Sequence, residues 1–428
     1  MSPITEKLAL IRNTPLSDHW EDTQQSFPQT PLPFLQPQAI AKTGALASLP
    51  PEAIAFAQEA ASIIASDPDL TRLAWHAHHV LFIGKTCPRS DVRDWPLLTP
   101  LLGNHGGTFY LLVILSGLPR IREIHQSLNV PEDIARDTYS DTCVWARQYH
   151  NIGVTRDGRF FHPGSPGAWG LDTRYMPWIL NHLYNDLYRV GRLQYKTGPF
   201  RQSLRAYYNR KSGHHCLLAE SGLRFRADGC FDGAGGIVDP DGAWMTELVE
   251  TPQSVSGNVI HPSGKARRTR RTLPLDTWER VLTQGDPILE IHIPEDGRMG
   301  FDDCGESLRQ VIDFFSTTFP DRPFKAICCT SWFLDPTYQT LLSELSNIAR
   351  FQRECYLFPL HSTGGRSGIE RIFYQYAHDL STAPRDTSMR RAVLDHLEGD
   401  GVLVSGGCLL FPDNLNWGTQ TYLNQFQN

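Results

Sequence analysis

The hydrophobic pattern of the chain changes near residue 210, and this change constrains the fold more than any other feature. Before it, apolar residues recur at three-to-four spacing, as in PPEAIAFAQEAASIIASD, which begins with proline as many helices do. After it, short segments such as HHCLLAES and GLRFRADG are bounded by turn-forming residues, as strands are. At 428 residues the chain also exceeds what one core usually serves. We therefore expect two domains, the first helical.

The expected boundaries follow from this pattern. Residues 1–37 are rich in Pro, Gln and Ser and predict an irregular lead-in. Residues 38–210 predict a helical domain, in which TFYLLVILSGLPRIREIHQSL is a buried helix interrupted at Gly117 and Pro119, and WILNHLYNDLYRVGRLQY continues the helical period. A short hairpin is expected at VTRDGRFFHP. Residues 211–428 form the second domain.

The second half alternates strand and helix patterns. PILEIHIPEDG predicts a strand, FDDCGESLRQVIDFFSTTF a helix, FKAICCTSWFL a buried strand and DPTYQTLLSELSNIARFQREC another helix. Preceded by hairpins, this order indicates layers of helix and sheet.

Composition narrows the function classes. A net charge of −6 gives no field that would attract nucleic acid or an anionic membrane. Nine cysteines without a C-x-x-C pair argue against a disulfide framework and a zinc ribbon, and we expect a cytoplasmic protein with no membrane span. His76, His78 and His79 do not share one helix face, so we expect no metal.

Particular strings resemble a known family. ILEIHIP, CCTSWFLDP and SELSNIARF resemble the GNAT-like C-terminal domain family, where GNAT denotes general N-acetyltransferase. RDTYSDTCVWARQ and LYRVGRLQY resemble the N-acyltransferase N-terminal domain that usually precedes it. The resemblance implies an α+β fold, in which an all-helical domain is followed by a GNAT-like α/β domain with a central mixed sheet. It also implies an acyltransferase that moves an acyl group from acyl-CoA or an acyl carrier protein to a small-molecule amine by direct attack.

Such a transfer needs a base for the ammonium, polarisation of the carbonyl, and a proton for the leaving thiolate. In ILEIHIP the period of two places Glu290 and His292 on one strand face, so both are candidate bases. The next strand offers proton donors, of which we select Cys329 and Ser331, with Cys328 and Thr330 beside them. A cysteine nucleophile, and hence a cysteine-dependent thioesterase or transferase, is the alternative enzyme class.

The resemblance also implies residues that bind CoA. The GNAT pyrophosphate loop, Q or R-x-x-G-x-G or A, is matched only in part by PEDGRMGFDDCGES, whose Asp302 and Asp303 oppose a phosphate. In the helix predicted after the strand FKAICCTSWFL, Asn347 resembles the asparagine that many GNAT proteins use to contact the pantetheine or acceptor region, and Arg350 lies one turn later on nearly the same face. The cofactor-binding candidates are therefore Ile293, Gly297, Arg298, Gly300, Asn347 and Arg350.

One basic run stands out in this acidic chain. KARRTRR contains Arg267, Arg268, Arg270 and Arg271. The run is either a solvated surface or a site for the phosphates of CoA or for an acyl carrier protein with its phosphopantetheine. A non-catalytic protein that only binds a carrier protein or ligand is the remaining alternative.

Overall fold

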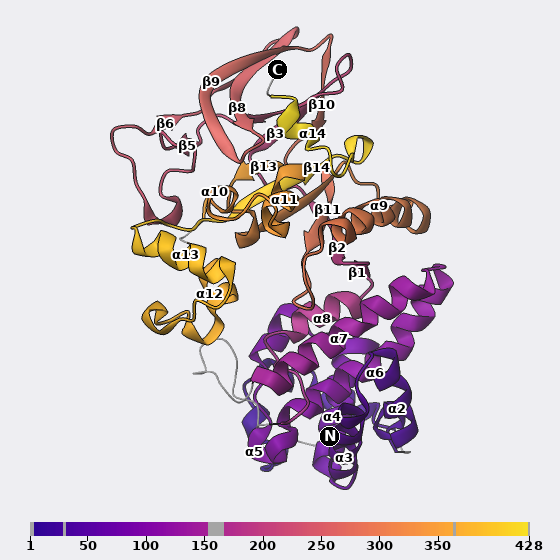
Figure 1. The fold of residues 1–428 in the computed structure, drawn as a ribbon. Helices are drawn as coiled ribbons and strands as arrows, with labels where there is room; N and C mark the ends of the chain where they lie inside the picture. The colour runs from indigo at the N-terminus through magenta and orange to yellow at the C-terminus, as the bar shows by residue number, and fades with distance from the viewer. Residues whose placement is uncertain (1–3, 29–30, 153–166, 363–364, 427–428) are drawn as a thin grey trace. The chain divides into compact units, whose positions relative to one another are not determined.

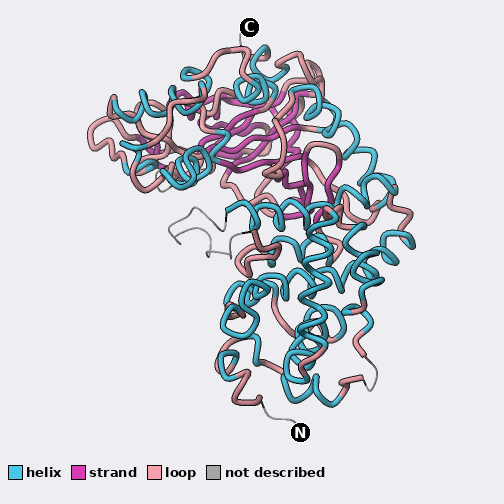
Figure 2. The backbone as a smooth tube through the Cα atoms, turned by 60° about the horizontal axis from the view of Figure 1, so that its bottom comes forward, coloured by secondary structure: helices cyan, strands magenta, loops and turns pink. Residues whose placement is uncertain are grey.

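The computed structural model describes residues 4–28, 31–152, 167–362 and 365–426. They form two compact units: Met1–Val190 with Pro294–Asp296, and Gly191–Ile293 with Gly297–Asn428. Helices, cyan in Figure 2, dominate the first unit, and nearly all strands, in magenta, belong to the second. The division follows Val190 and not residue 210, because the segment between them forms strands.

The first unit confirms the predicted helical domain. Prolines begin three of its helices, where the missing N–H costs no hydrogen bond. Its elements, indigo to magenta in Figure 1, are α1 (Trp20–Gln25), α2 (Pro37–Leu46), α3 (Pro51–Ala65), α4 (Pro68–His78), α5 (Thr99–Leu102), α6 (Gly106–Ser127), α7 (Glu132–Ile152), α8 (Met176–Leu183) and β1 (Leu187–Val190).

Helix α6 is the buried centre of this unit. The predicted interruption is wrong, because the helix continues through Gly117 and Pro119. Gly117 is needed for packing, since a Cβ there would lie 2.5 Å from the ring of Phe82. By length and composition the segment Thr99–Ser127 could cross a membrane, but 78% of its most apolar window is buried inside the protein, as in a core helix.

The predicted irregular lead-in is also wrong for residues 4–28, which pack into the first unit. Leu8, Ile11 and Leu16 are fully buried, and the ring of Trp20 lies 5.0 Å from that of His76. Polar residues and prolines separate these apolar residues along the sequence. The local composition therefore does not predict that they are buried. The hairpin predicted at VTRDGRFFHP lies outside the described residues.

The second unit contains a mixed sheet, an antiparallel sheet, a two-stranded sheet and six α-helices in its described part. Its strands are β2 (Leu193–Pro199), β3 (Leu204–Asn209), β4 (His215–Ala219), β5 (Arg224–Phe225), β6 (Trp244–Met245), β7 (Leu248–Glu250), β8 (Ser254–His261), β9 (Lys265–Pro274), β10 (Trp278–Leu282), β11 (Pro287–His292), β12 (Ala326–Ser331), β13 (Tyr356–Pro359) and β14 (Gly406–Leu410). Its helices are α9 (Phe301–Thr318), α10 (Tyr338–Leu341), α11 (Asn347–Glu354), α12 (Arg366–Phe373), α13 (Ser388–Glu398) and α14 (Thr421–Asn424).

The mixed sheet of this unit has the strand order β2-β11-β12-β14-β13 and confirms the predicted central mixed sheet. Strand β11 is parallel to β12 and antiparallel to β2. Helix α9 covers one face, where the Ser307 hydroxyl lies 2.8 Å from that of Tyr195 and accepts a hydrogen bond from the backbone N–H of Leu193. Figure 1 shows α9 beside β2 and β11.

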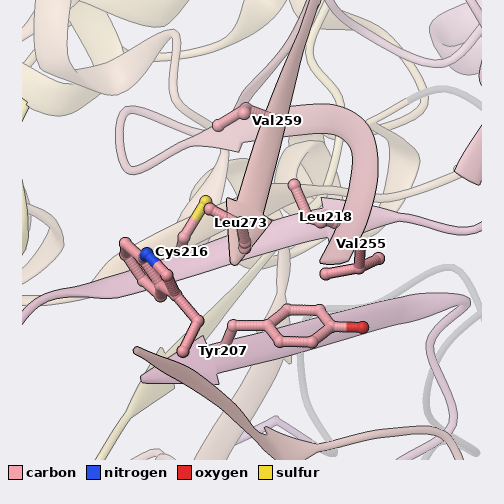
Figure 3. Close-up of a cluster of buried hydrophobic side chains, with 7 residues drawn as sticks. Tyr207, Cys216, Leu218, Val255, Val259 and Leu273 are labelled. Carbon is pink, nitrogen blue, oxygen red and sulfur yellow. The ribbon is translucent and has the colours of Figure 1, made fainter. Parts of the chain in front are cut away.

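The antiparallel sheet has its own apolar core. Figure 3 shows Tyr207, Cys216, Leu218, Val255, Val259 and Leu273 gathered between its strands. Tyr356 joins the two sheets: its hydroxyl donates to the carbonyl of Ile260 at 2.6 Å and accepts from the N–H of Leu217 at 3.2 Å. The antiparallel sheet is therefore hydrogen-bonded, through this tyrosine, to the mixed sheet.

The single helix predicted over DPTYQTLLSELSNIARFQREC is wrong. The segment forms two helices, α10 and α11, separated at Leu342–Ser346. Ser346 caps the N-terminus of the second helix, because its hydroxyl accepts a hydrogen bond from the N–H of Ala349 at 3.1 Å. The side-chain cap starts a new helix within a segment whose hydrophobic pattern predicts a continuous one.

Candidate active site

Strands β11 and β12 part at their carboxyl ends. Their pairing runs from Ile288 opposite Ala326 to Glu290 opposite Cys328. Beyond that point β11 stays paired with β2 as far as His292, and β12 stays paired with β14 as far as Ser331. The two parallel strands therefore diverge over their last residues. Openings at the carboxyl ends of parallel strands are where open α/β sheets bind ligands.

The register assigns the polar side chains to the two faces of the sheet. Because Glu290 is opposite Cys328, the side chains of Glu290, His292, Cys328 and Thr330 share one face. Cys329 and Ser331 lie on the other face. The predicted grouping of Glu290 and His292 is confirmed, whereas the sheet separates both from Cys329 and Ser331.

Glu290 and His292 form a pair at the opening. Their Oε2 and Nε2 atoms are 3.8 Å apart, and each side chain is about one third exposed, at 31% and 33%. The interaction with His292 is the first cause that lowers the pKa of Glu290, and the charges of Lys196 and Arg201 lower it further, although partial burial opposes them. Glu290 therefore carries a negative charge at neutral pH.

Gly198 on β2 makes room for this carboxylate. A Cβ at this position would lie 2.6 Å from Oε1 of Glu290, closer than van der Waals contact allows. Strand residues without a side chain often mark such a close approach. Sequence reasoning missed Gly198, because its partner is far away along the chain.

The structure contradicts the selection of Cys329 and Ser331 as proton donors beside the predicted base. Cys329 is buried, and burial first, then the neighbouring Cys408, raises the pKa of its thiol well above the ordinary value. The Ser331 hydroxyl instead accepts a hydrogen bond from the N–H of Phe333 at 3.2 Å. Thr330 is exposed and lies on the face of Glu290, so it replaces them as the hydroxyl at the opening.

The geometry also disfavours a cysteine nucleophile. Cys328 shares the face of Glu290, but it is only 5% exposed, and burial raises the pKa of its thiol well above the ordinary value. A thiol held protonated and buried is a poor nucleophile.

The loop before α9 is shaped by glycine and by Arg192. Gly297 has a φ of +70°, and the guanidinium of Arg192 donates to the carbonyls of Gly297 and Arg298 at 3.2 and 2.9 Å. Gly300 precedes the helix, and the carboxylate of Asp303 folds back over it. Ile293, the first residue after β11, begins this loop and is half-buried. The predicted glycines are thus at a helix N-terminus, but with an acid close to it.

Helix α11 brings a cation to the same helix N-terminus. The guanidinium carbon of Arg350 lies 3.7 Å above the ring centroid of Phe301, the first residue of α9. Phe301 also contacts Trp417, whose indole N–H donates to the Phe301 carbonyl at 3.0 Å. Asn347 is exposed at the first residue of α11. Arg350 therefore contacts the residue that follows the predicted Gly300, whereas no pattern in the sequence indicated Phe301 or Trp417.

The basic run lies on β9 and does not form one uniform patch. Arg270 pairs with Glu247 at 2.5 Å, and Arg268 donates to the carbonyl of Gly242 at 2.7 Å. Arg271 lies over the ring of Trp278 at 5.2 Å and, as a neighbour of Arg270 on a strand, points to the opposite face. Arg267 is exposed.

The histidines of α4 have structural partners. The ring nitrogens of His76 lie 2.7 Å from the Thr23 hydroxyl and 2.8 Å from the Leu16 carbonyl, and Nδ1 of His78 lies 2.7 Å from the Ser116 hydroxyl. Within the described residues, no group of three His, Cys, Asp or Glu side chains is placed to hold a metal ion.

Comparisons with known proteins agree with this architecture. Residues 187–410 match the model of the GNAT-like C-terminal domain, and residues 40–153 match that of the N-acyltransferase N-terminal domain. No match is found among curated protein sequences. The fold is similar to that of an acyltransferase mutant in complex with octanoyl-CoA and to that of an acyltransferase in complex with CoA and 10C-Teicoplanin. Each is 19% identical, with a TM-score of 0.58 over 92% of this chain and 95% of the other.

Proposed function

Because this chain belongs to the N-acyltransferases that join an N-acyltransferase N-terminal domain to a GNAT-like C-terminal domain, we propose that it transfers an acyl group from acyl-CoA to a small-molecule amine by direct attack. The observation that carries this proposal is the parting of β11 and β12 beside Glu290 and His292. A thioester carbonyl in this opening meets backbone amides of the strands on one side and a base on the other.

In the proposed reaction the amine nitrogen attacks the thioester carbonyl and the C–S bond breaks. His292 accepts the proton that the ammonium must lose, and the carboxylate of Glu290, 3.8 Å away, stabilises the imidazolium that forms. The hydroxyl of Thr330, exposed on the same face, passes its proton to the departing thiolate and takes up in exchange the second proton that the attacking nitrogen loses as the amide forms. The products are an amide and free CoA.

The region around Arg350 supports CoA as the donor. Its guanidinium and the N-terminus of α9 both favour an anion, and Phe301 holds the guanidinium in place. Two solved structures with a similar fold contain CoA or octanoyl-CoA. An acyl carrier protein is the other donor we consider, with exposed Arg267 on β9 as its contact. The acceptor is proposed to be a small molecule, since one of those structures also contains 10C-Teicoplanin.

The first experiment measures binding of CoA and of acyl-CoAs with different chain lengths by thermal shift and calorimetry. A ligand that binds the native state raises its unfolding temperature. We expect saturable binding that improves with one acyl length. Absence of binding at millimolar concentration would contradict acyl-CoA as the donor, and the same measurement with a purified acyl carrier protein would then test that donor.

The second experiment measures CoA release in the presence of an amine panel for His292→Gln and Glu290→Gln. Loss of a general base lowers kcat/KM by about 10²–10⁴-fold without weakening CoA binding. His19→Gln is the control, because His19 is an exposed histidine of the first unit, near Asp22 and outside the proposed site. If His292→Gln and Glu290→Gln both acylate amines at the wild-type rate, the assignment of the base is wrong.

A further inference from the structure

The tight loop 226–230, which directly follows β5, holds one cysteine in a fixed place. Within this loop the N–H of Arg226 donates to the carbonyl of Cys230 at 2.8 Å, and the N–H of Cys230 donates to Oδ1 of Asp228 at 3.0 Å. Gly229, with a φ of +82°, accepts a hydrogen bond from the N–H of Ala266 at 2.9 Å. A Cβ at Gly229 would lie 2.5 Å from the Ala266 carbonyl oxygen. The loop is therefore fastened to the start of β9.

Lys265, the first residue of β9, directs its amine at the sulfur of Cys230. The Nζ to Sγ distance is 2.8 Å. Other polar contacts of cysteine sulfur in the described part of the chain are longer: 3.9 Å from Arg147 to Cys143, and 3.3 Å from Cys355 to the carbonyl of Phe351. Sulfur is larger than oxygen, so a nitrogen at 2.8 Å is in unusually close contact. The two atoms are already at a separation from which a bond can form.

Charged groups surround this pair. The guanidinium of Arg226 binds Asp228 through two hydrogen bonds, at 3.2 and 3.0 Å, and also interacts electrostatically with Cys230. Nζ of Lys265 lies 3.8 Å from the same carboxylate. Two cations therefore lie near the sulfur. The carboxylate of Asp228 interacts with both of these cations.

Access to the pair is limited to small reagents. Cys230 is 5% exposed, whereas the side chain of Lys265 is 31% exposed. A peroxide molecule is small enough to reach a sulfur that a protein or a CoA thioester could not approach. Nothing in the proposed acyl transfer uses either residue.

We propose that Cys230 and Lys265 form an oxidation-sensitive pair that hydrogen peroxide converts into a covalent sulfur–nitrogen link. In the first step the Cys230 thiolate attacks one peroxide oxygen, the O–O bond breaks, and sulfenic acid and hydroxide form. Sulfur loses two electrons and the peroxide gains them. The hydroxide removes a proton from the Lys265 ammonium.

In the second step the neutral amine of Lys265 attacks the sulfur of the sulfenic acid. The S–N bond forms, the S–O bond breaks, and the leaving hydroxide combines with the proton released from nitrogen, giving water. Condensation of a sulfenic acid with a nitrogen is established chemistry, and a thiol reductant reverses it. The link joins the loop to β9 and removes the positive charge of Lys265.

The test exposes the full-length protein to graded hydrogen peroxide and maps its peptides by mass spectrometry without a reductant. We expect a peptide pair joined through Cys230 and Lys265, lighter than the sum of its reduced parts by two hydrogens, that dithiothreitol separates. Cys230→Ser must not give it. Lys265→Arg keeps a cation beside the sulfur but removes the attacking amine, so this variant should instead accumulate a sulfenic acid that dimedone traps.

Two results would overturn the proposal. One is a Cys230 that stays reduced at peroxide concentrations that oxidise Cys87, the half-buried cysteine of the first unit. The other is a Cys230 that proceeds to sulfinic acid equally fast in the wild type and in Lys265→Arg, with no joined peptides. Because the measurement is a mass and not a rate of acyl transfer, it is independent of the proposed enzymatic activity.

Discussion

Thr330 and Ser331 are adjacent hydroxyl residues with opposite expected roles. Thr330→Val removes the hydroxyl on the face of Glu290 while keeping the shape, so we expect kcat to fall by about tenfold or more with little change in KM, as for loss of a proton donor. Ser331→Ala removes the hydroxyl that accepts from the N–H of Phe333, and should cost about 1 kcal/mol of unfolding free energy with normal activity. Steady-state kinetics and urea unfolding of both variants check this. A stable Ser331→Ala that has lost activity would reverse the assignment.

The same two residues show which feature of the site the sequence alone does not predict. Alternation along a strand predicts that Glu290 and His292 share a face, and the structure confirms it. Alternation within β12 cannot say which of its residues are on that face, because this depends on the register between two strands. The pairing of Glu290 with Cys328 supplies that information and selects Thr330. A shift of one residue would have selected Cys329 and Ser331.

At the scale of elements, the frame around the candidate site is predictable. The strand PILEIHIP, the helix FDDCGESLRQVIDFFSTTF and the strand FKAICCTSWFL each carry a strong local pattern, and all three are confirmed as β11, α9 and β12. The helix predicted over β2 is wrong, because residues 194–199 pair with β11, almost a hundred positions later in the sequence. Non-local pairing of this kind leaves no signal in a local window.

Helix α11 makes a testable contribution through Arg350. Arg350→Lys keeps the charge but loses the planar group that lies on Phe301, so we expect CoA to bind about tenfold more weakly. Acyl-pantetheine, which lacks the nucleotide phosphates, should be used equally well by the variant and the wild type. Calorimetry with CoA and rates with both donors measure these effects.

Arg353→Lys is the matched control for that prediction. Arg353 lies one turn later on the same helix and pairs with Glu344 at 3.2 Å, so this change should leave CoA affinity unaltered. Equal weakening by both variants would show that helix stability, and not the guanidinium on Phe301, controls the affinity.

The whole molecule is expected to lose stability in mild acid because of its buried histidines. Burial is the first cause that lowers the pKa of four histidines from 6.5 to about 4, namely His76, His78, His125 and His215. Between pH 6.5 and 4 the unfolded chain therefore binds more protons than the folded one, so the stability present above pH 6.5 is lost as the pH falls through this window. Each histidine contributes at most about 3.5 kcal/mol, at about 1.4 kcal/mol per pKa unit.

The two units should respond unequally, because three of these histidines belong to the first unit and one to the second. Hydrogen exchange at pH 7.5 and pH 5 is expected to show the larger loss of protection in α4 and α6, which hold His76, His78 and His125. His76→Gln keeps a polar group between Thr23 and Leu16 but cannot titrate near neutral pH. This variant should be less stable than the wild type at pH 7.5 and yet lose less stability on acidification, because one of the protonations that favour the unfolded chain is gone. An unchanged pH slope in His76→Gln would mean that the acid sensitivity of the first unit comes from other groups.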